Sequence, residues 1–216
     1  MFSWFASLHT KSDPLDTGKG NPSNQSLNDV IDVESNVVVV GSREGRCFME
    51  SWLAERAKLG RTTYLFSNDS VDAEDGLPRV SLEDMDGILQ SQRGIAETFD
   101  TPPTTLIVDS TIDHSDPRLQ AMLQSAKQLH LSVVVLVSDL HRIPPIVVSS
   151  LDYIVLLSAF MSRKQRLTCY DTLLKKANLS PVAMIAIREL GKRERSQRGA
   201  TVICPTDGSH YSIKVR

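Results

Sequence analysis

The sequence predicts an α/β protein with a mostly parallel central sheet, helices flanking that sheet, and a β-hairpin near the C-terminal end. Two observations carry the prediction. Short apolar runs alternate with segments of helical periodicity, and the runs are apolar at consecutive positions rather than at every second one. Strands of that kind are typical of parallel sheets that helices cover on both faces.

Five apolar runs, rich in β-branched residues, are the predicted parallel strands. They span 36–40, 62–66, 104–109, 132–137 and 153–157. Two more segments, 201–204 and 211–215, flank the turn sequence Pro205-Thr-Asp-Gly208 and predict the hairpin. The acidic segment 67–80 is predicted to be a loop.

Helical spacing of apolar residues fills the intervals between the strands. The best-marked helix starts at Ser81, an N-cap residue with Asp84 three positions further on, and Pro102-Pro103 stop it. Helices are predicted over 81–99, 117–129, 163–178 and 181–190, with another from the segment after Gly45 to Gly60 and a short one opened by Pro144-Pro145. Residues 1–30 are predicted to be a flexible N-terminal arm, and 31–216 a single domain.

Composition and charge narrow the class of protein. Hydrophobic residues make up 41% and charged residues 23%, as in ordinary globular proteins, and no apolar run approaches the roughly 20 residues of a membrane span. Three cysteines without a CxxC pair favour a reducing, cytoplasmic setting. Residues 1–100 hold 9 Lys/Arg and 17 Asp/Glu, whereas 101–216 hold 15 and 9. A basic half can bind nucleic acid or an acidic partner. Charge alone, however, favours a dipolar surface that binds no partner.

A glycine-bearing loop separates the first strand from the helix that follows. Backbone N–H groups of such a loop can bind phosphate, and the full pattern GxxxxGK[ST] adds a lysine for phosphate and a hydroxyl for Mg²⁺. Here the glycine spacing is one residue shorter, arginine replaces lysine, and a thiol, which suits Mg²⁺ poorly, replaces the hydroxyl. An ATP-phosphate site and a plain turn are equally supported. The candidate residues are Gly41, Ser42, Arg43, Glu44, Gly45, Arg46 and Cys47.

A carboxylate ends the third predicted strand. In P-loop NTPases such an Asp holds Mg²⁺ and the next residue is usually an acid that activates water. Asp109 is therefore the candidate catalytic and Mg²⁺-binding residue, although Ser110 is a poor base. The alternative role for Asp109 is to cap the loop that follows it. Asp113-His114 beside Asp116 comes nearest to a metal-ligand set but lacks a fourth ligand.

The order of these features, from Val37 to Val215, resembles the viral genome-packaging ATPases of the FtsK/HerA type, which are P-loop NTPases of the additional-strand class. The strongest stretch is 132–157, where Pro144-Pro145 and Asp152-Tyr153 keep the family's spacing. The resemblance implies a RecA-like three-layer sandwich and ATP with Mg²⁺ as cofactors. It also implies a homo-oligomeric ring on double-stranded DNA, capsid or other assembly proteins as partners, and a place in the host cytoplasm or virion.

Departures from the family pattern fall on its chemistry. Where the resemblance places a Gln sensor, the chain has Ser138 or Asp139, and where it places an arginine that acts across a subunit boundary, the chain has Val148. Lys127 lies near a position that is often basic in the family. These departures, with the altered phosphate loop and Ser110, imply weakened or lost ATP hydrolysis.

A basic stretch follows the last predicted helix. Its candidate contacts to the DNA backbone would be independent of sequence and sensitive to salt, whereas the alternative is a solvated loop. The residues are Lys192, Arg193, Arg195 and Arg198. Two functions stay open: a viral DNA-packaging ATPase-like protein, which if active couples ATP hydrolysis to DNA translocation, or a catalytically inactive P-loop subunit that acts through protein interactions. Binding of MgATP separates them.

Overall fold

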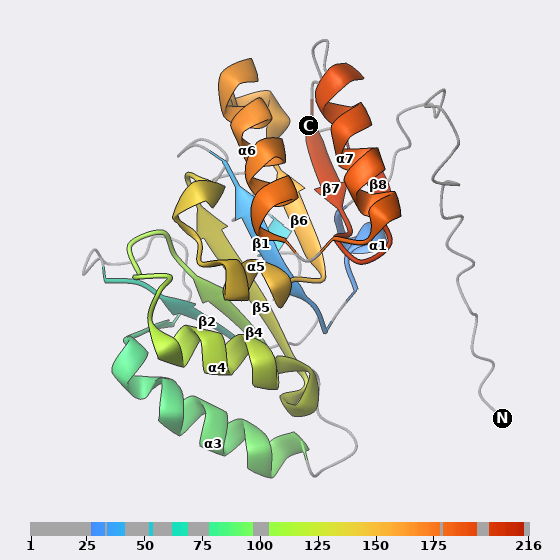
Figure 1. The fold of residues 1–216 in the computed structure, drawn as a ribbon. Coiled ribbons are helices and arrows are strands. Elements are labelled where there is room, and N and C mark those ends of the chain that lie inside the picture. The colour runs from blue at the N-terminus through green and yellow to red at the C-terminus, as the bar shows by residue number, and fades with distance from the viewer. Residues whose placement is uncertain are drawn as a thin grey trace, which may run out of the picture.

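A central sheet with helices on both faces makes up the protein (Figure 1). The computed structural model describes residues 27–32, 34–41, 52–53, 62–68, 78–96, 104–177, 179–193 and 199–213. Within these residues the sheet has eight strands in the order β3-β2-β4-β5-β1-β6-β7-β8. The predicted fold class is confirmed.

The strands from β1 to β6 pair in parallel, and the last two are antiparallel. The C-terminal hairpin is confirmed, and it extends the sheet beyond β6. One strand, β3, falls inside the segment predicted to be a loop, because two residues are too few to show a period. The strands are β1 (Asn36–Val40), β2 (Thr63–Phe66), β3 (Arg79–Val80), β4 (Thr104–Val108), β5 (Leu131–Val137), β6 (Tyr153–Leu156), β7 (Ala200–Ile203) and β8 (His210–Ile213).

Strand β5 lies between β1 and β4, with Val39 opposite Leu136 and Val134 opposite Ile107. A strand is thus inserted between the one that leads into the glycine loop and the one that leads to Asp109, as the additional-strand class requires. Because these strands are parallel, their carboxyl ends share one edge of the sheet, which is where open α/β sheets bind ligands.

The helices agree with the predicted segments. A 3₁₀ turn at Leu82–Asp84 leads into α3, where the Asp84 carboxylate accepts hydrogen bonds from the Ser81 N–H (3.1 Å) and Oγ (2.9 Å). Of the helix predicted after the glycine loop, Trp52 and Leu53 are helical and the rest lies outside the described residues. The helices are α1 (Leu27–Val30), α3 (Met85–Ala96), α4 (Pro117–Ser125), α5 (Pro145–Ser149), α6 (Arg163–Lys176) and α7 (Pro181–Arg193).

Two apolar layers, one on each face of the sheet, form the core. Val38 and Val40 point into the layer under α3 to α7, which lie together on one face in Figure 1. Val37 and Val39 point into the opposite layer, with Leu27 of α1. Both sets are buried, which explains why β1 carries four consecutive valines rather than alternating apolar and polar residues.

Helix α1 overlaps the end of the predicted N-terminal arm, residues 1–30. Helix α1 contains the last four residues of the segment 1–30, and its Leu27 is buried against the sheet. The preceding residues lie outside the described part, so the arm stays a prediction there. No helix in the described ranges has the length and apolar character needed to cross a membrane.

Candidate functional site

Gly41, the first residue after β1, belongs to the carboxyl edge of the sheet. Its N–H donates to the Val137 carbonyl (3.1 Å), which continues the ladder between β1 and β5 by one residue. A Cβ at this position would lie 2.8 Å from Leu157 Cδ1, so the close approach of Leu157 favours glycine. The remaining residues predicted to bind phosphate, Ser42, Arg43, Glu44, Gly45, Arg46 and Cys47, lie outside the described residues and stay predictions.

Asp109 directly follows β4 and is 8% exposed. Its Oδ1 accepts hydrogen bonds from the N–H (2.6 Å) and Oγ (3.2 Å) of Ser110. Its Oδ2 accepts from Ser67 Oγ and from Thr111 Oγ1, both at 3.4 Å. The carboxylate therefore caps the loop after β4. Each carboxylate oxygen can accept more than one bond, so these contacts are compatible with a hydrated Mg²⁺, and the metal and catalytic roles of Asp109 stay predictions.

Polar residues at the ends of β2 and β4 form a network around that carboxylate. Thr111 Oγ1 accepts from the Asn68 N–H (3.0 Å), and the Asn68 side chain donates to the Thr111 carbonyl (2.9 Å). Ser67 and Thr111 also share a contact of 3.3 Å. This network was not predicted, and its signal in the sequence is the polar residue directly after each of two neighbouring strands.

A cavity of about 230 Å³ opens at the same edge, beside the carboxyl ends of β4 and β5. Its polar lining includes Ser110, Asp113, His114, Ser138, Asp139 and Arg142. Ser138 and Asp139, the residues at the predicted sensor position, thus share one cavity with the residue that follows Asp109. Asp139 Oδ1 accepts from the His141 N–H (2.9 Å), which fixes the turn after β5. Arg142 was not among the predicted site residues.

His114 lies at this cavity as a half-buried imidazole. Its Nε2 is inaccessible to solvent and has no hydrogen bond of good geometry within the described residues. Burial lowers the pKa of His114, although the negative charges of Asp113 and Asp109 and the Leu136 carbonyl oppose the shift. The ring is therefore neutral at physiological pH.

The two carboxylates near His114, Asp113 and Asp116, accept hydrogen bonds from residues two positions further along the chain. Asp113 Oδ1 accepts from the Oγ (2.6 Å) and N–H (2.9 Å) of Ser115, and these bonds lower the pKa of Asp113. Asp116 caps α4 and forms an ion pair with Arg118 at 2.7 Å. Across the described ranges, no group of three or more His, Cys, Asp or Glu side chains is placed to hold a metal ion.

The Asp152-Tyr153 pair, which carries much of the resemblance, has structural contacts. Asp152 Oδ2 accepts from the Asn36 N–H (2.9 Å), and Oδ1 accepts from Lys127 Nζ (2.6 Å). The Tyr153 hydroxyl donates to Asp32 (2.8 Å), and burial together with that bond raises its pKa. Val148 is 1% exposed and lies in the core, so this position faces the interior.

Of the residues predicted to contact DNA, Lys192 is described in full. It is exposed on α7, and its Nζ forms an ion pair with Glu189 at 2.7 Å. Exposed pairs contribute little, about 0–1 kcal/mol, so a phosphate could displace Glu189 at small cost. Arg193 ends α7, but its side chain is outside the description, as are Arg195 and Arg198 entirely. The DNA contacts stay a prediction.

The fold and this edge define the class: the chain has a P-loop NTPase fold with the inserted strand β5. No protein-family model and no curated protein sequence matches the chain. Among solved structures, the genome packaging NTPase B204 from Sulfolobus turreted icosahedral virus 2, in complex with ATP-gammaS, is similar with a TM-score of 0.60 and 13% identity, over 86% of this chain and 100% of that one.

Two further structures share the fold. The DNA-packaging ATPase B204 from Sulfolobus turreted icosahedral virus has a TM-score of 0.60 and 12% identity, over 86% of this chain and 100% of that one. The cytoplasmic domain of the type VII secretion ATPase EccC from Thermomonospora curvata has a TM-score of 0.52 and 8% identity, over 84% of this chain and 25% of that one. At these low sequence identities the similarity establishes the fold alone.

Proposed function

We propose that the chain is a viral DNA-packaging ATPase-like protein with weakened or lost ATP hydrolysis. The observation that carries the proposal is the shared carboxyl edge, where Gly41 and Asp109 directly follow β1 and β4 on either side of the inserted β5. A packaging NTPase of the same fold, similar over its full length, was solved with ATP-gammaS and with AMPPCP. ATP would bind at this edge. The glycine loop 41–47 would contact its phosphates, and Asp109 would hold the Mg²⁺.

Weakened hydrolysis is supported by the residues at the edge. Ser110 stands where an acid would activate water, and its hydroxyl donates to Asp109. Asp109 is also engaged by Ser67 and Thr111, so reorganising it toward a metal would cost several hydrogen bonds. Val148 is buried and apolar, so this position cannot present a charge to a neighbouring subunit.

The proposal extends to partners and setting. A homo-oligomeric ring around double-stranded DNA would place the end of α7, with Lys192 and the basic stretch after it, near the phosphate backbone. Capsid or other assembly proteins would bind the outside of the ring, in the host cytoplasm or the virion. Residues 1–30 would be an arm on a single domain formed by 31–216.

Calorimetry with MgATP tests the nucleotide site. Asp109→Asn removes the charge and keeps the shape, and Asp171→Asn makes the same change at an exposed position of α6. We expect micromolar binding by the wild type, a loss of at least tenfold in Asp109→Asn, since a hydrogen bond to a charged group contributes about 1.5–3 kcal/mol, and no change in Asp171→Asn. Equal affinities of the two variants would remove Asp109 from the site.

An inactive structural or assembly subunit is the second candidate. The loop-capping contacts of Asp109 favour it, because they give that residue a role without a metal. This candidate predicts no binding at millimolar MgATP, together with oligomers in analytical ultracentrifugation that nucleotide does not change. Stimulation of ATPase activity by DNA would exclude it.

A further inference from the structure

The cavity beside β4 and β5 has a lining suited to a charged, multi-atom group. Its volume of about 230 Å³ is far larger than a single water requires. Ser110 and Ser138 contribute hydroxyls, His114 a neutral imidazole, and Arg142 a guanidinium. Hydrogen-bond donors therefore enter the cavity from both strand ends, at the edge where the fold binds ligands.

Arg142 is the permanent positive charge in that described lining. It is exposed, and within the described residues its guanidinium has no hydrogen bond or ion pair, unlike Arg118, Lys127 and Lys192. An arginine fork that is not already paired can accept a phosphate in bidentate geometry.

The backbone on both sides of Arg142 is fixed. Asp139 starts the turn by accepting from the His141 N–H (2.9 Å). Lys176, from the end of α6, closes the turn by donating to the carbonyls of His141 (2.6 Å) and Ile143 (2.9 Å). The arginine thus extends from a short turn that side chains hold at both ends, so little backbone freedom is lost when it binds a ligand.

Two carboxylates decide what kind of anion the cavity can take. Asp113 and Asp139 each accept bonds from their own loops, and both contribute a carboxylate to the lining. A free anion would be repelled by them, whereas a phosphoryl group that arrives with a divalent cation would meet Arg142 and the carboxylates with opposite charges.

We propose that this cavity is the subsite for the terminal phosphoryl group of a magnesium nucleotide, and that Arg142 is the residue that distinguishes a triphosphate from a diphosphate. The inference rests on the proposed function, because it assigns one end of the nucleotide to a place at the same edge. In this assignment the turn after β5 supplies a cation, Arg142, for the phosphoryl group. Val148, six residues further on at the position where the family has an arginine, faces the core and cannot supply one.

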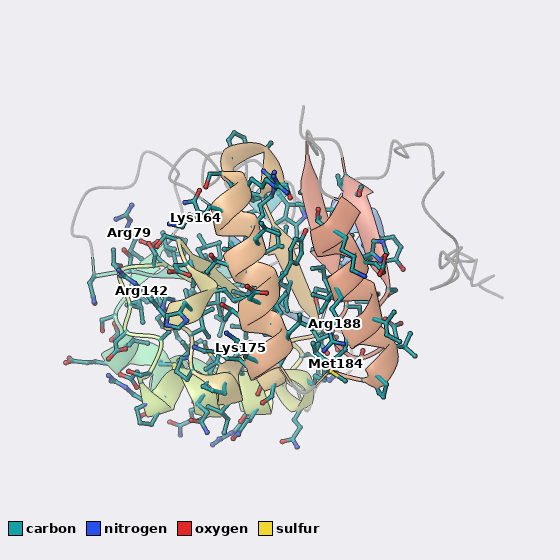
Figure 2. The ribbon with its side chains drawn as sticks, turned by 45° about the horizontal axis from the view of Figure 1, so that its top comes forward. Arg79, Arg142, Lys164, Lys175, Met184 and Arg188 are labelled. Atoms are coloured by element: carbon teal, nitrogen blue, oxygen red, sulfur yellow. The ribbon has the colours of Figure 1, made fainter. Side chains whose placement is uncertain are left out.

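Calorimetry with MgATP and MgADP on Arg142→Ala tests the assignment. Losing a charge-assisted hydrogen bond lowers affinity about 10- to 100-fold, so we expect that loss for MgATP and less than a twofold change for MgADP. Arg142→Lys should restore part of the difference. Arg188→Ala, which removes an exposed arginine from α7 on the far side of α6 (Figure 2), should leave both affinities unchanged.

The outcomes separate this inference from the proposed function. If Arg142→Ala weakens both nucleotides equally, or neither, while its urea unfolding midpoint matches the wild type, the subsite is wrong and the nucleotide site stands. If the wild type binds neither nucleotide at millimolar concentration, the proposed function fails. A second experiment then adds inorganic phosphate with Mg²⁺ and follows the NMR chemical shifts of the His114 ring, which lines the cavity. Shifts that disappear in Arg142→Ala would keep the cavity as a phosphate site but not as a nucleotide subsite, and no shifts would overturn both.

Discussion

Gly208 closes the turn between β7 and β8 and lies against the first turns of α7. It has a φ of +76°, and its N–H donates to the Cys204 carbonyl (3.0 Å). A Cβ added here would lie 2.5 Å from Ala183 Cα and 2.8 Å from Ala183 N. Both atoms belong to the backbone of α7, so relief requires the hairpin and the helix to move apart.

The expected cost of Gly208→Ala follows from three contributions. A left-handed conformation costs an alanine about 1–2 kcal/mol. Overpacking against fixed backbone costs about 1–3 kcal/mol. The reduced freedom of the unfolded chain returns about 0.4–1 kcal/mol. We therefore expect the free energy of unfolding to fall by about 2–4 kcal/mol.

Urea unfolding of Gly208→Ala, followed by far-UV circular dichroism, measures this loss. Gly87→Ala is the matched control, because Gly87 is exposed in α3 and an added Cβ would meet nothing within 4 Å. That control should gain about 0.5–1 kcal/mol, since alanine favours helix over glycine. A loss below about 1 kcal/mol in Gly208→Ala would refute the close packing of the hairpin on α7.

Three further expectations concern the fold and its surfaces. Asn36→Ala removes the donors to the carbonyls of Leu123 (2.9 Å) and Ser150 (3.0 Å), and should lower the free energy of unfolding by about 2–3 kcal/mol. The exposed Asn68→Ala should cost less in the same urea titration, and equal losses would contradict the importance of Asn36. Because the pKa of His114 is lowered in the folded protein, the unfolded chain binds a proton first as pH falls below about 6.5, so stability should decrease from pH 7 to pH 5. His114→Gln should flatten this decrease in thermal unfolding scans, and an unchanged slope would show that His114 is not its source. Lys192→Ala should weaken binding to double-stranded DNA about equally for all sequences and reduce the slope of log affinity against log salt by about 0.9, measured by fluorescence anisotropy. An unchanged slope would place Lys192 outside the interface.

Helices and strands could be predicted from the sequence where one short segment contains the complete pattern of an element. β1 carries four consecutive valines because it is buried on both faces, and Ser81 marks the start of its helix through contacts that span three residues. β3 was missed because it has two residues and depends on β2 for its pairing. The position of β5 between β1 and β4 came from the resemblance, since periodicity contains no information about which strands are neighbours.

The site was less accessible to sequence reasoning, because its contacts join distant residues. Asp109 was found from its place after a strand, but its partner Ser67 is 42 residues earlier. His114 was noted for its acidic neighbours, yet its environment depends on the end of β5. Arg142 gave no signal, since only the fold shows that the turn carrying it borders a cavity.

The pairing of β1 has a consequence for how the chain folds during synthesis. β1 is among the earliest elements to leave the ribosome, but its two neighbours are β5 and β6, which begin at Leu131 and Tyr153. At roughly 5–20 residues per second, the 91 residues from Val40 to Leu131 take about 5–20 seconds to make. Meanwhile β2 and β4 can already pair, whereas the four consecutive valines of β1 have no strand to join. That interval is when aggregation or capture by a chaperone competes with folding, so slower translation of the segment 41–130 should lower the soluble yield.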